Sequence, residues 1–458
     1  MGFYVQTSYT VCMFTRWFHN LSKNAALLLA LTPLCLLRAS SMPSVLGYDY
    51  GFYRYAALHP SLSLNAIFTG VQGGYANILF PLLHALHVPV DVGLIACLYL
   101  AAIALGATLC YILLPYSKTA AICGVLLLAC STIQSETYNM FLWKTVLALP
   151  LLLMGLLGLE KKKYILLGGA LLALILTHRT TLIVLLLAVG LHIFIRLITT
   201  RRWHYVLYVG LGLGLLALTL GDSLGAWWHI VFSSANGDVV AGIFFHNQNV
   251  LVALLPISLL ALYGLSTMVK QKSTPATLLL FVGISLGWIF LRLPFYHRFY
   301  IYLDLGLLLL GAIGLATLWQ NNKNFWLRAV IVIGLILLFL QNIQHIRDTP
   351  ILISQAEIQE ISSFTTPLPA PFVLATSAED APWLLGYLER SRLAAPGLFE
   401  DTHPETTWRQ FWRGEAQQLF LSGFPQPLYL YDRSFKLSGR IHDCLTKVSE
   451  NFSKFTCN

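Results

Sequence analysis

The chain has 458 residues, of which 57% are hydrophobic and only 11% are charged. A soluble domain usually carries about 25% charged residues, and the apolar residues here form long blocks near the ~20 residues that cross a bilayer. The formal net charge of +9 would favour nucleic acid as a partner of a soluble protein. However, no basic stripe with interleaved aromatic residues is present. The composition therefore excludes a nucleic-acid binder and predicts a multi-pass membrane protein.

Eleven apolar segments are predicted to span the membrane, and they make residues 1–345 an all-α polytopic domain. The first segment has no good cleavage site near Arg38, so we interpret it as a retained span and not as a signal peptide. The predicted spans are residues 24–41, 92–114, 118–134, 140–158, 163–178, 181–199, 204–220, 248–268, 276–293, 299–319 and 327–344.

Basic residues in the short loops predict the orientation of these spans. They gather on alternate loops, and the positive-inside rule places that side in the cytoplasm. With an odd number of spans, the N-terminus is then cytoplasmic and the C-terminal tail lies outside the cytoplasmic membrane. The basic residues are Arg16, Lys23, Lys118, Lys161, Lys162, Lys163, Arg196, Arg201, Arg202, Lys270, Lys272, Lys323 and Arg328.

The predicted outer face has two long loops, residues 42–91 and 221–247, and long ordered loops usually carry function. Within the first loop, residues 77–90 are apolar but too short to cross, which favours an interfacial helix on the outer leaflet.

The tail, residues 346–458, has a mixed composition that predicts a small extracytoplasmic α/β domain. Its two cysteines, Cys444 and Cys457, could pair if the tail is in an oxidising compartment. The predicted helices are residues 355–365, 381–390 and 405–422, and the predicted strands are residues 372–376 and 428–431.

Ionisable side chains gather at the predicted outer ends of the spans, where they are costly and therefore candidates for function. Asp49 lies among tyrosines just after the first span, and Glu136 lies in a predicted short loop. A half-dry carboxylate can act as a general base, and the two acids could share a substrate or a divalent cation such as Mg²⁺ or Mn²⁺. The alternatives are that Asp49 is a turn residue neutralised by Arg54, and that Glu136 is a solvated loop acid.

Cationic side chains at the same face are suited to a phosphate, because a guanidinium forms charge-assisted bonds with its oxygens. The alternative for each is snorkelling to lipid headgroups. Asp304 could form a structural ion pair with Arg298. The candidates for binding a lipid phosphate are Arg298, Arg292, Lys144 and Arg179. Further candidates for contacting substrate are Tyr48, Tyr50, His178, His297 and His246.

Together these features resemble the type-C membrane glycosyltransferases (GT-C fold), which use polyprenyl-phosphate-linked sugars. The stretch after the first span reads Gly47-Tyr48-Asp49-Tyr50-Gly51-Phe52-Tyr53. In that family an acid occupies this place, and an interfacial helix with a Pro-Leu pair follows, as Pro81-Leu82 does here. A second acid lies in the second outer loop, where Glu136 stands. The tail segments 381–387 and 395–401 look like tails of prokaryotic members.

The resemblance implies an inverting transfer of a sugar from a polyprenyl-phosphate donor to a glycan, lipid or protein acceptor. It assigns Asp49 as general base, while Glu136 orients the acceptor or binds a divalent cation with Asp49. Many members carry two adjacent or alternating acids in the first loop, whereas Asp49 stands alone. This departure leaves a metal-independent route, as in the family's protein mannosyltransferases and lipid A aminoarabinose transferases.

Two other classes remain open. A polysaccharide polymerase or ligase also has about eleven spans, with key Arg and His residues in an outer loop, but residues 221–247 contain His229 and His246 without an arginine. A transporter is expected to show inverted repeats and polar residues at the bilayer midplane, and neither is evident in the sequence.

Overall fold

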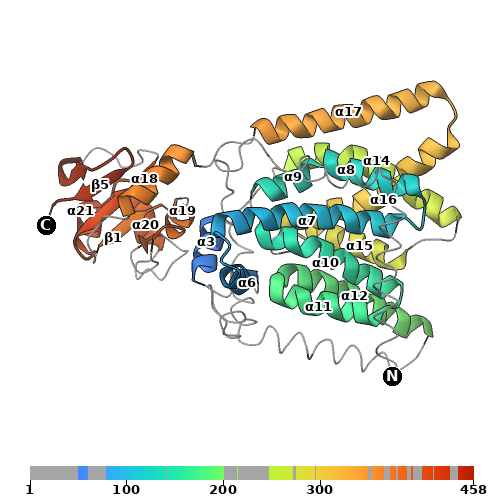
Figure 1. The fold of residues 1–458 in the computed structure, drawn as a ribbon, viewed down its shortest axis with the longest axis horizontal. Coiled ribbons are helices and arrows are strands. Elements are labelled where there is room, and N and C mark those ends of the chain that lie inside the picture. Colours follow the sequence, from blue (N-terminus) through green and yellow to red (C-terminus); the bar gives the residue numbers. More distant parts are fainter. Residues whose placement is uncertain are drawn as a thin grey trace. The chain divides into compact units, whose positions relative to one another are not determined.

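The computed structural model divides into two compact units (Figure 1). Unit 1 comprises Met1–Ser40, Leu62–Leu79 and Val92–Pro350, and unit 2 comprises Ser41–Ser61, Phe80–Asp91 and Ile351–Asn458. Unit 2 thus includes parts of the predicted first outer loop besides the predicted tail domain. The structure describes residues 50–59, 79–140, 142–200, 214, 247–271, 275–293, 296–348, 353–365, 372–377, 380–388, 393–395, 405–415, 417–433 and 442–457.

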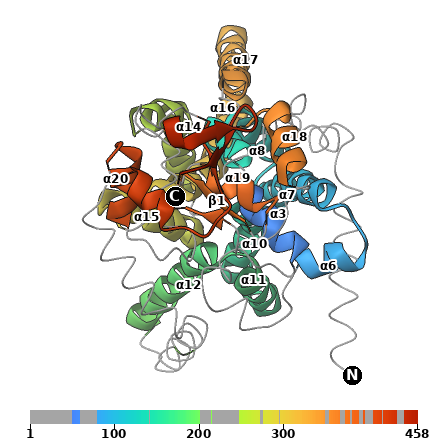
Figure 2. The ribbon, with the colours of Figure 1, turned by 90° about the vertical axis from the view of Figure 1, so that its left-hand side faces the viewer.

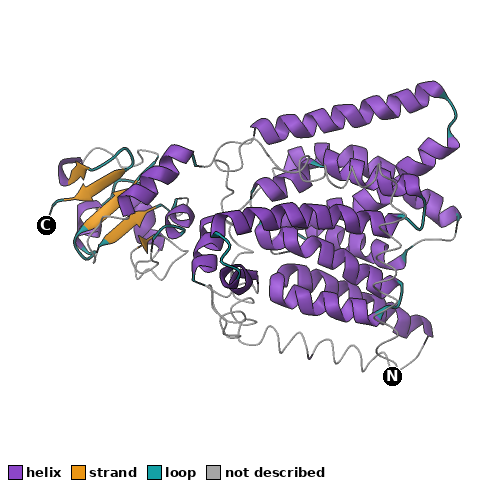
Figure 3. Ribbon diagram, in the orientation of Figure 1, coloured by secondary structure: helices purple, strands orange, loops and turns teal. Residues whose placement is uncertain are grey.

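The described part of unit 1 is a bundle of apolar helices, and all of the described strands belong to unit 2 (Figure 3). The helix that opens unit 1 takes its first two residues from unit 2. In chain order the elements are α7 (Val90–Leu113), α8 (Lys118–Cys130), α9 (Thr132–Asn139), α10 (Trp143–Glu160), α11 (Tyr164–Thr177), α12 (Arg179–Thr200), α14 (Asn247–Lys270), α15 (Ala276–Phe290), η2 (Tyr296–Arg298), α16 (Phe299–Asn321) and α17 (Phe325–Asp348).

Six of the described helices, α7, α10, α12, α14, α16 and α17, are long and apolar enough to cross a membrane, or seven spans if α8 and α9 count as one. The helices α11 and α15 are apolar but shorter. Each predicted span between residues 92 and 344 coincides with one of these helices, except 204–220. That span, apart from residue 214, and the span 24–41 lie outside the described residues, so the total of eleven stays a prediction.

The predicted third span is wrong in one respect, because it is broken. The helix α8 ends at Cys130, the chain bends by 56°, and α9 follows at once. Ser131 lies at the break, and its side-chain oxygen accepts a hydrogen bond from the Gln134 backbone N–H at 3.1 Å, which is the usual way a serine starts a helix. Glu136, expected in a loop, is therefore helical and buried.

The helix α16 is the centre of unit 1, and its closest neighbour is α14. A Cβ atom at Gly264 would overlap the carbonyl oxygen of Leu310, and one at Gly314 would overlap that of Leu260. The two backbones are therefore in direct contact, as small residues permit between membrane helices. The most apolar window of α16 is 83% buried, against 6% for that of α17. The latter helix stands at the edge of the bundle in Figure 2.

We predict that Gly314→Ala destabilises unit 1 by about 1–3 kcal/mol, the usual cost of overpacking. The added methyl group must push α14 away at the Leu260 carbonyl. The matched control is Gly283→Ala on α15, where no described atom lies within 4 Å of a Cβ. Thermal unfolding in detergent checks this: a melting temperature that falls for Gly283→Ala as much as for Gly314→Ala contradicts the backbone contact.

Unit 2 contains a five-stranded mixed sheet in the order β2-β1-β3-β5-β4. Strand β1 runs parallel to β2 and to β3, whereas β5 runs antiparallel to β3 and to β4. Parallel neighbours require crossover connections, which α19 and the pair α20–α21 supply. The elements are α3 (Tyr50–Leu58), α6 (Leu79–Ala85), α18 (Gln355–Thr365), β1 (Val373–Thr376), α19 (Ala381–Leu385), β2 (Leu393–Ala394), α20 (Glu405–Trp412), α21 (Gln417–Ser422), β3 (Leu428–Tyr431), η4 (His442–Cys444), β4 (Leu445–Lys447) and β5 (Phe452–Phe455).

The core of unit 2 is aromatic. Trp408 and Phe411 of α20 pack against Phe420 of α21, and the cluster continues to Leu430 of β3. These rings explain why two short helices can cover the sheet, since each ring buries a large apolar area. Cys444 and Cys457, which the sequence offered as a pair, form a disulfide that ties η4 to the segment after β5.

The carboxylate of Glu360, on α18, fixes the turn before β5. It accepts hydrogen bonds from the Asn451 backbone N–H at 2.9 Å and side-chain amide at 2.7 Å, and from the Ser449 hydroxyl. Burial by itself would raise the pKa of Glu360, but these donors outweigh it and hold the pKa below its usual value. The carboxylate therefore stabilises the fold above its unfolded-state pKa, and this contribution is lost as the pH falls through the folded-state value.

We predict that Glu360→Gln lowers the stability of unit 2 at pH 7 by about 1 kcal/mol, allowing for partial exposure. Its difference from the unchanged protein should shrink as the pH falls below ~4, where the native carboxylate is protonated as well. Hydrogen exchange of peptides covering β3 and β5, at pH 7 and at a pH below ~4, measures this difference in stability. The control variant is Glu450→Gln, which changes an exposed glutamate in the same turn. If Glu360→Gln loses the same stability at both pH values, the charge of the Glu360 carboxylate is not responsible.

Candidate functional site

One end of unit 1 is rich in buried polar side chains. It is formed by α9, the starts of α10, α12 and α16, and the last turns of α17 (Figure 1). Polar groups inside an apolar bundle are costly, and those retained usually act in function. We call this region the polar end. Its buried polar residues are Ser131, Gln134, Ser135, Glu136, Thr137, Asn139, Lys144, Thr181, Asp304 and Asn342.

Asp304 is the most deeply placed carboxylate of the polar end, with only 1% of its surface exposed. Its Oδ2 atom accepts hydrogen bonds from the Ser131 hydroxyl at 2.8 Å and from Gln134 Nε2 at 2.9 Å. The same Gln134 nitrogen also donates to the carbonyl oxygen of Ile301 at 3.1 Å. The sequence suggested an ion pair of Asp304 with Arg298, but its described partners are Ser131 and Gln134. These hydrogen bonds join α9 to α16.

Glu136 faces the opposite neighbour, α17. Its Oε2 atom lies 2.9 Å from His345 Nε2, and the carboxylate side chain is 7% exposed while the imidazole is 44% exposed. One turn earlier on α17, Asn342 donates to the Ser135 hydroxyl and to the Ala129 carbonyl oxygen, each at 2.8 Å. The pair Glu136–His345 thus has one buried and one accessible member, an arrangement that can exchange protons with a substrate.

Several buried polar atoms of the polar end have no hydrogen-bond partner among the described residues. Each such atom costs about 1–3 kcal/mol relative to a satisfied one. Native structures retain few of them, so a cluster indicates a site that a ligand or water completes. The atoms are Gln134 Oε1, the Tyr138 hydroxyl, Asn139 Nδ2, Asp304 Oδ1 and Asn342 Oδ1.

A second cluster, the cationic cluster, lies between α10, α12 and α16. His178 Nδ1 is 2.7 Å from the Thr181 hydroxyl, which is 2.8 Å from the Tyr302 hydroxyl. Lys144, in the first turn of α10, and Arg298, directly before α16, are the cations of this region, and both are within electrostatic reach of His178. Lys144 is only 7% exposed. Two positive charges held beside a chain of hydroxyl groups form a suitable place for an anion.

The remaining predicted residues are distributed differently. Arg292 is exposed in the turn after α15, with a φ of 48°, and His297 lies in η2 with its ring 3.8 Å from that of Tyr296. Arg179 begins α12, and its side chain is not described. The positions Tyr48, Asp49 and His246 lie outside the described residues.

The described part of the Asp49 motif begins at Tyr50, the first residue of α3. Tyr50 is buried, its hydroxyl bonds Asp91, and its ring lies 6.1 Å from that of Trp383 on α19. Tyr50 is thus held by contacts inside unit 2, and its contact with a substrate stays a prediction. Arg54 bonds the same Asp91 at 3.0 Å and stacks over Tyr387 at 4.3 Å.

The tail segment 381–387 contacts α3, the helix that directly follows Asp49 in the sequence. The helix α19 packs on α3 so closely that a Cβ at Gly386 would lie 3.1 Å from the Gly51 Cα. Arg54, expected to neutralise Asp49, is instead occupied by Asp91 and by the Gly386 carbonyl oxygen. Unit 2 therefore fixes the residues that directly follow Asp49.

Among the described residues, no three His, Cys, Asp or Glu side chains come together in a way that could hold a metal ion. Of the predicted metal pair, Glu136 is bonded to His345, and Asp49 lies outside the described residues.

Comparison with known protein families finds none whose profile matches the chain. No curated protein matches it in sequence either. The class of the protein therefore follows from its architecture. Several apolar helices that could span a membrane, joined to a small sheet unit, indicate a membrane protein with a C-terminal domain.

Sequence reasoning missed His345, Asn342 and Gln134. A signal for the first two was present, because polar residues three apart at the end of the last predicted span lie on one face of a helix. Gln134 gave no signal, since its role depends on the break at Ser131.

We predict opposite effects of the same chemical change at two buried tyrosines. Tyr138→Phe should keep or raise the melting temperature, because its hydroxyl has no partner among the described residues. Tyr302→Phe should lower the stability by about 1 kcal/mol, because it removes the hydrogen bond with Thr181. Thermal unfolding of both variants in detergent measures this, and an equal loss in both would show that the Tyr138 hydroxyl is satisfied.

Proposed function

We propose that the protein is an integral membrane glycosyltransferase that takes a sugar from a polyprenyl-phosphate donor. The acceptor is a glycan, lipid or protein at the outer face of the membrane, and the anomeric centre is inverted. The proposal follows the resemblance to the type-C membrane glycosyltransferases. The observation that supports it is the group of polar side chains at one end of unit 1, which includes the buried Lys144, the hydrogen-bonded pair His178–Thr181 and the Glu136–His345 pair.

The reaction begins when Asp49 takes the proton of the acceptor hydroxyl. The acceptor oxygen attacks the anomeric carbon from the face opposite the phosphate, and a new glycosidic bond forms. The bond between that carbon and the phosphate oxygen breaks, and its electron pair leaves with the polyprenyl phosphate. Charge therefore grows on the phosphate, where fixed cations stabilise the transition state most strongly.

The cationic cluster is suited to this task by burial as well as by charge. A cation in surroundings of low dielectric interacts more strongly with an anion than one in water, and Lys144 is almost fully buried. Arg298 ends η2, four residues before Tyr302 of α16, so a phosphate bound there could also accept a hydrogen bond from a hydroxyl group. Arg292, exposed in its turn, is a weaker candidate for this contact.

The Glu136–His345 pair is the proposed place for the acceptor. The accessible imidazole can hydrogen-bond a sugar hydroxyl, and the buried carboxylate orients it. If a divalent cation such as Mg²⁺ or Mn²⁺ takes part, Asp49 and Glu136 are the proposed ligands. The assignment of Asp49 as the base follows the resemblance alone, because this residue lies outside the described part of the chain.

We predict that Asp49→Asn abolishes sugar transfer, because an amide cannot accept the proton of the acceptor. Arg298→Gln should mainly weaken donor use, lowering kcat/KM by about 100-fold if one phosphate contact contributes ~2.7 kcal/mol. Transfer from a radiolabelled polyprenyl-phosphate sugar in proteoliposomes measures both.

The control is Asp443→Asn, an exposed acid in unit 2, which should transfer at the unchanged rate. Each variant should elute as a single species at the unchanged position in size exclusion. Sugar transfer retained by a folded Asp49→Asn protein would overturn the assignment of the base, and failure to use any polyprenyl-phosphate sugar would overturn the function.

A further inference from the structure

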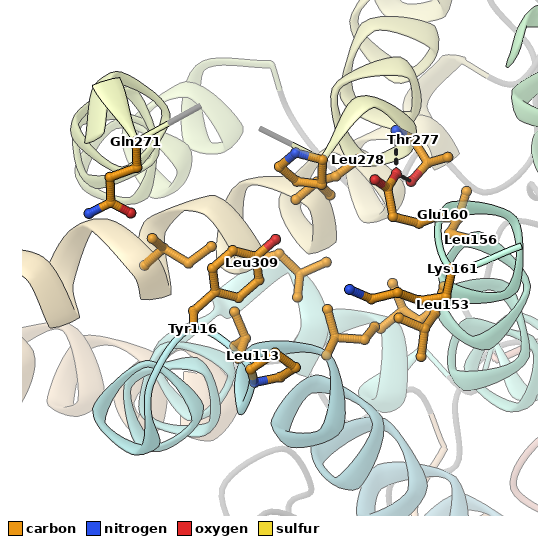
Figure 4. Close-up of a pocket in the computed structure, with 15 residues that line it drawn as sticks. Leu113, Tyr116, Leu153, Leu156, Glu160, Lys161, Gln271, Thr277, Leu278 and Leu309 are labelled. Carbon is orange, nitrogen blue, oxygen red and sulfur yellow. Dashed lines mark hydrogen bonds between the residues drawn. The ribbon is translucent and has the colours of Figure 1, made fainter. Parts of the chain in front are cut away.

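The end of unit 1 opposite the polar end contains a cavity of about 450 Å³. Its walls come from α7, α10, α15 and α16, and they are mainly leucine, isoleucine and proline side chains (Figure 4). This volume lies within the ~300–1,000 Å³ of small-molecule sites. The cavity is therefore large enough for an apolar chain, and its walls match one.

The polar groups of the cavity lie on its rim. Lys161 and Tyr116 point into the hollow from two turns between helices, and Gln271 stands at the end of α14 (Figure 4). Glu160, the one acid among the described residues of the lining, is turned toward Thr277 and accepts hydrogen bonds from its backbone N–H at 3.0 Å and from its hydroxyl. The carboxylate is thus occupied, and Lys161 carries the charge that remains for a ligand.

The position of the cavity along the helices sets the depth of its rim. Lys161 follows the last residue of α10, and Lys144 lies in the first turn of the same helix, so about 25 Å separates them along the axis. That length is close to the ~30 Å of a bilayer core. Lys162 and Lys163 follow directly and are exposed, so the rim lies where lipid headgroups are expected.

We propose that this cavity binds an anionic membrane lipid, with an acyl chain between α7, α10, α15 and α16 and the headgroup at Lys161 and Tyr116. The apolar walls select a lipid over a soluble anion, and the lysine-rich turn selects an anionic headgroup over a zwitterionic one. A lipid bound there would contact α7, α10, α15 and α16 at the same time. The site is separate from the proposed glycosyl-transfer site and does not depend on it.

The test uses the full-length protein in detergent and three probes. They are phosphatidylglycerol, phosphatidylcholine with the same acyl chains, and glycerol 3-phosphate, which is an anionic headgroup without chains. Native mass spectrometry measures retention, and thermal unfolding measures stabilisation. We expect phosphatidylglycerol to be retained and to raise the melting temperature. An equal effect of phosphatidylcholine, or an effect of glycerol 3-phosphate alone, overturns the proposal.

Two pairs of variants place the lipid in this cavity. Lys161→Glu should weaken phosphatidylglycerol binding about tenfold, since one basic residue near an anionic lipid contributes about a factor of five and reversal adds repulsion. Lys162→Glu reverses the same charge in the same turn but does not line the cavity, so it should weaken binding clearly less. An equal loss in both would mean general surface attraction and would contradict the site.

Leu157→Trp fills the cavity from α10, whereas Leu151→Trp adds the same bulk to a half-buried position outside its lining. Only the first should prevent retention of phosphatidylglycerol. Unchanged retention in a folded Leu157→Trp protein overturns the proposal. If a variant does not fold, the comparison of the three probes on the unchanged protein still decides it.

Discussion

The hydrogen bonds of the Asp304 carboxylate hold the polar end together. A carboxylate with 1% exposure inside an apolar bundle requires donors, because burying an unpaired charge is very costly. Ser131 and Gln134 supply them, and both residues exist in this position only because the chain breaks between α8 and α9. The break turns α9 so that its other side meets α17. One buried carboxylate thus fixes Glu136, Asn342 and His345 in relation to one another.

The two ends of unit 1 differ in the polarity of their buried side chains. At the polar end, hydroxyl, amide and charged groups are buried, and several of their atoms lack a partner among the described residues. At the other end the charges lie on exposed turns, and the buried space is apolar and partly empty. The backbone contact of α14 with α16 at Gly264 and Gly314 lies at the level of this cavity, since Ile313, which lines it, directly precedes Gly314.

Unit 2 combines a sheet with a segment from far earlier in the chain. The contact between α3 and α19 depends on small residues, since Gly51 and Gly386 let the two helices approach, and on Arg54, which bonds Asp91 and stacks over Tyr387. A C-terminal domain could have been an independent attachment. Here its described contacts include the residues that follow Asp49, so loss of the domain would also release α3.

The sequence by itself determined which of the described segments are apolar helices and that the tail carries strands, because blocks of about 20 apolar residues and alternating patterns are local properties. It also offered Cys444 and Cys457 as a pair for an oxidising compartment, and the two form a disulfide. It did not show that residues of the first long loop belong to the same unit as the sheet. Only the tertiary structure decided the partners of the buried polar groups. Asp304 was expected beside Arg298, six residues away, but its partners lie on α9, about 170 residues earlier in the chain. Sequence spacing cannot report such contacts, because they depend on which helices pack together and on a single bend at Ser131.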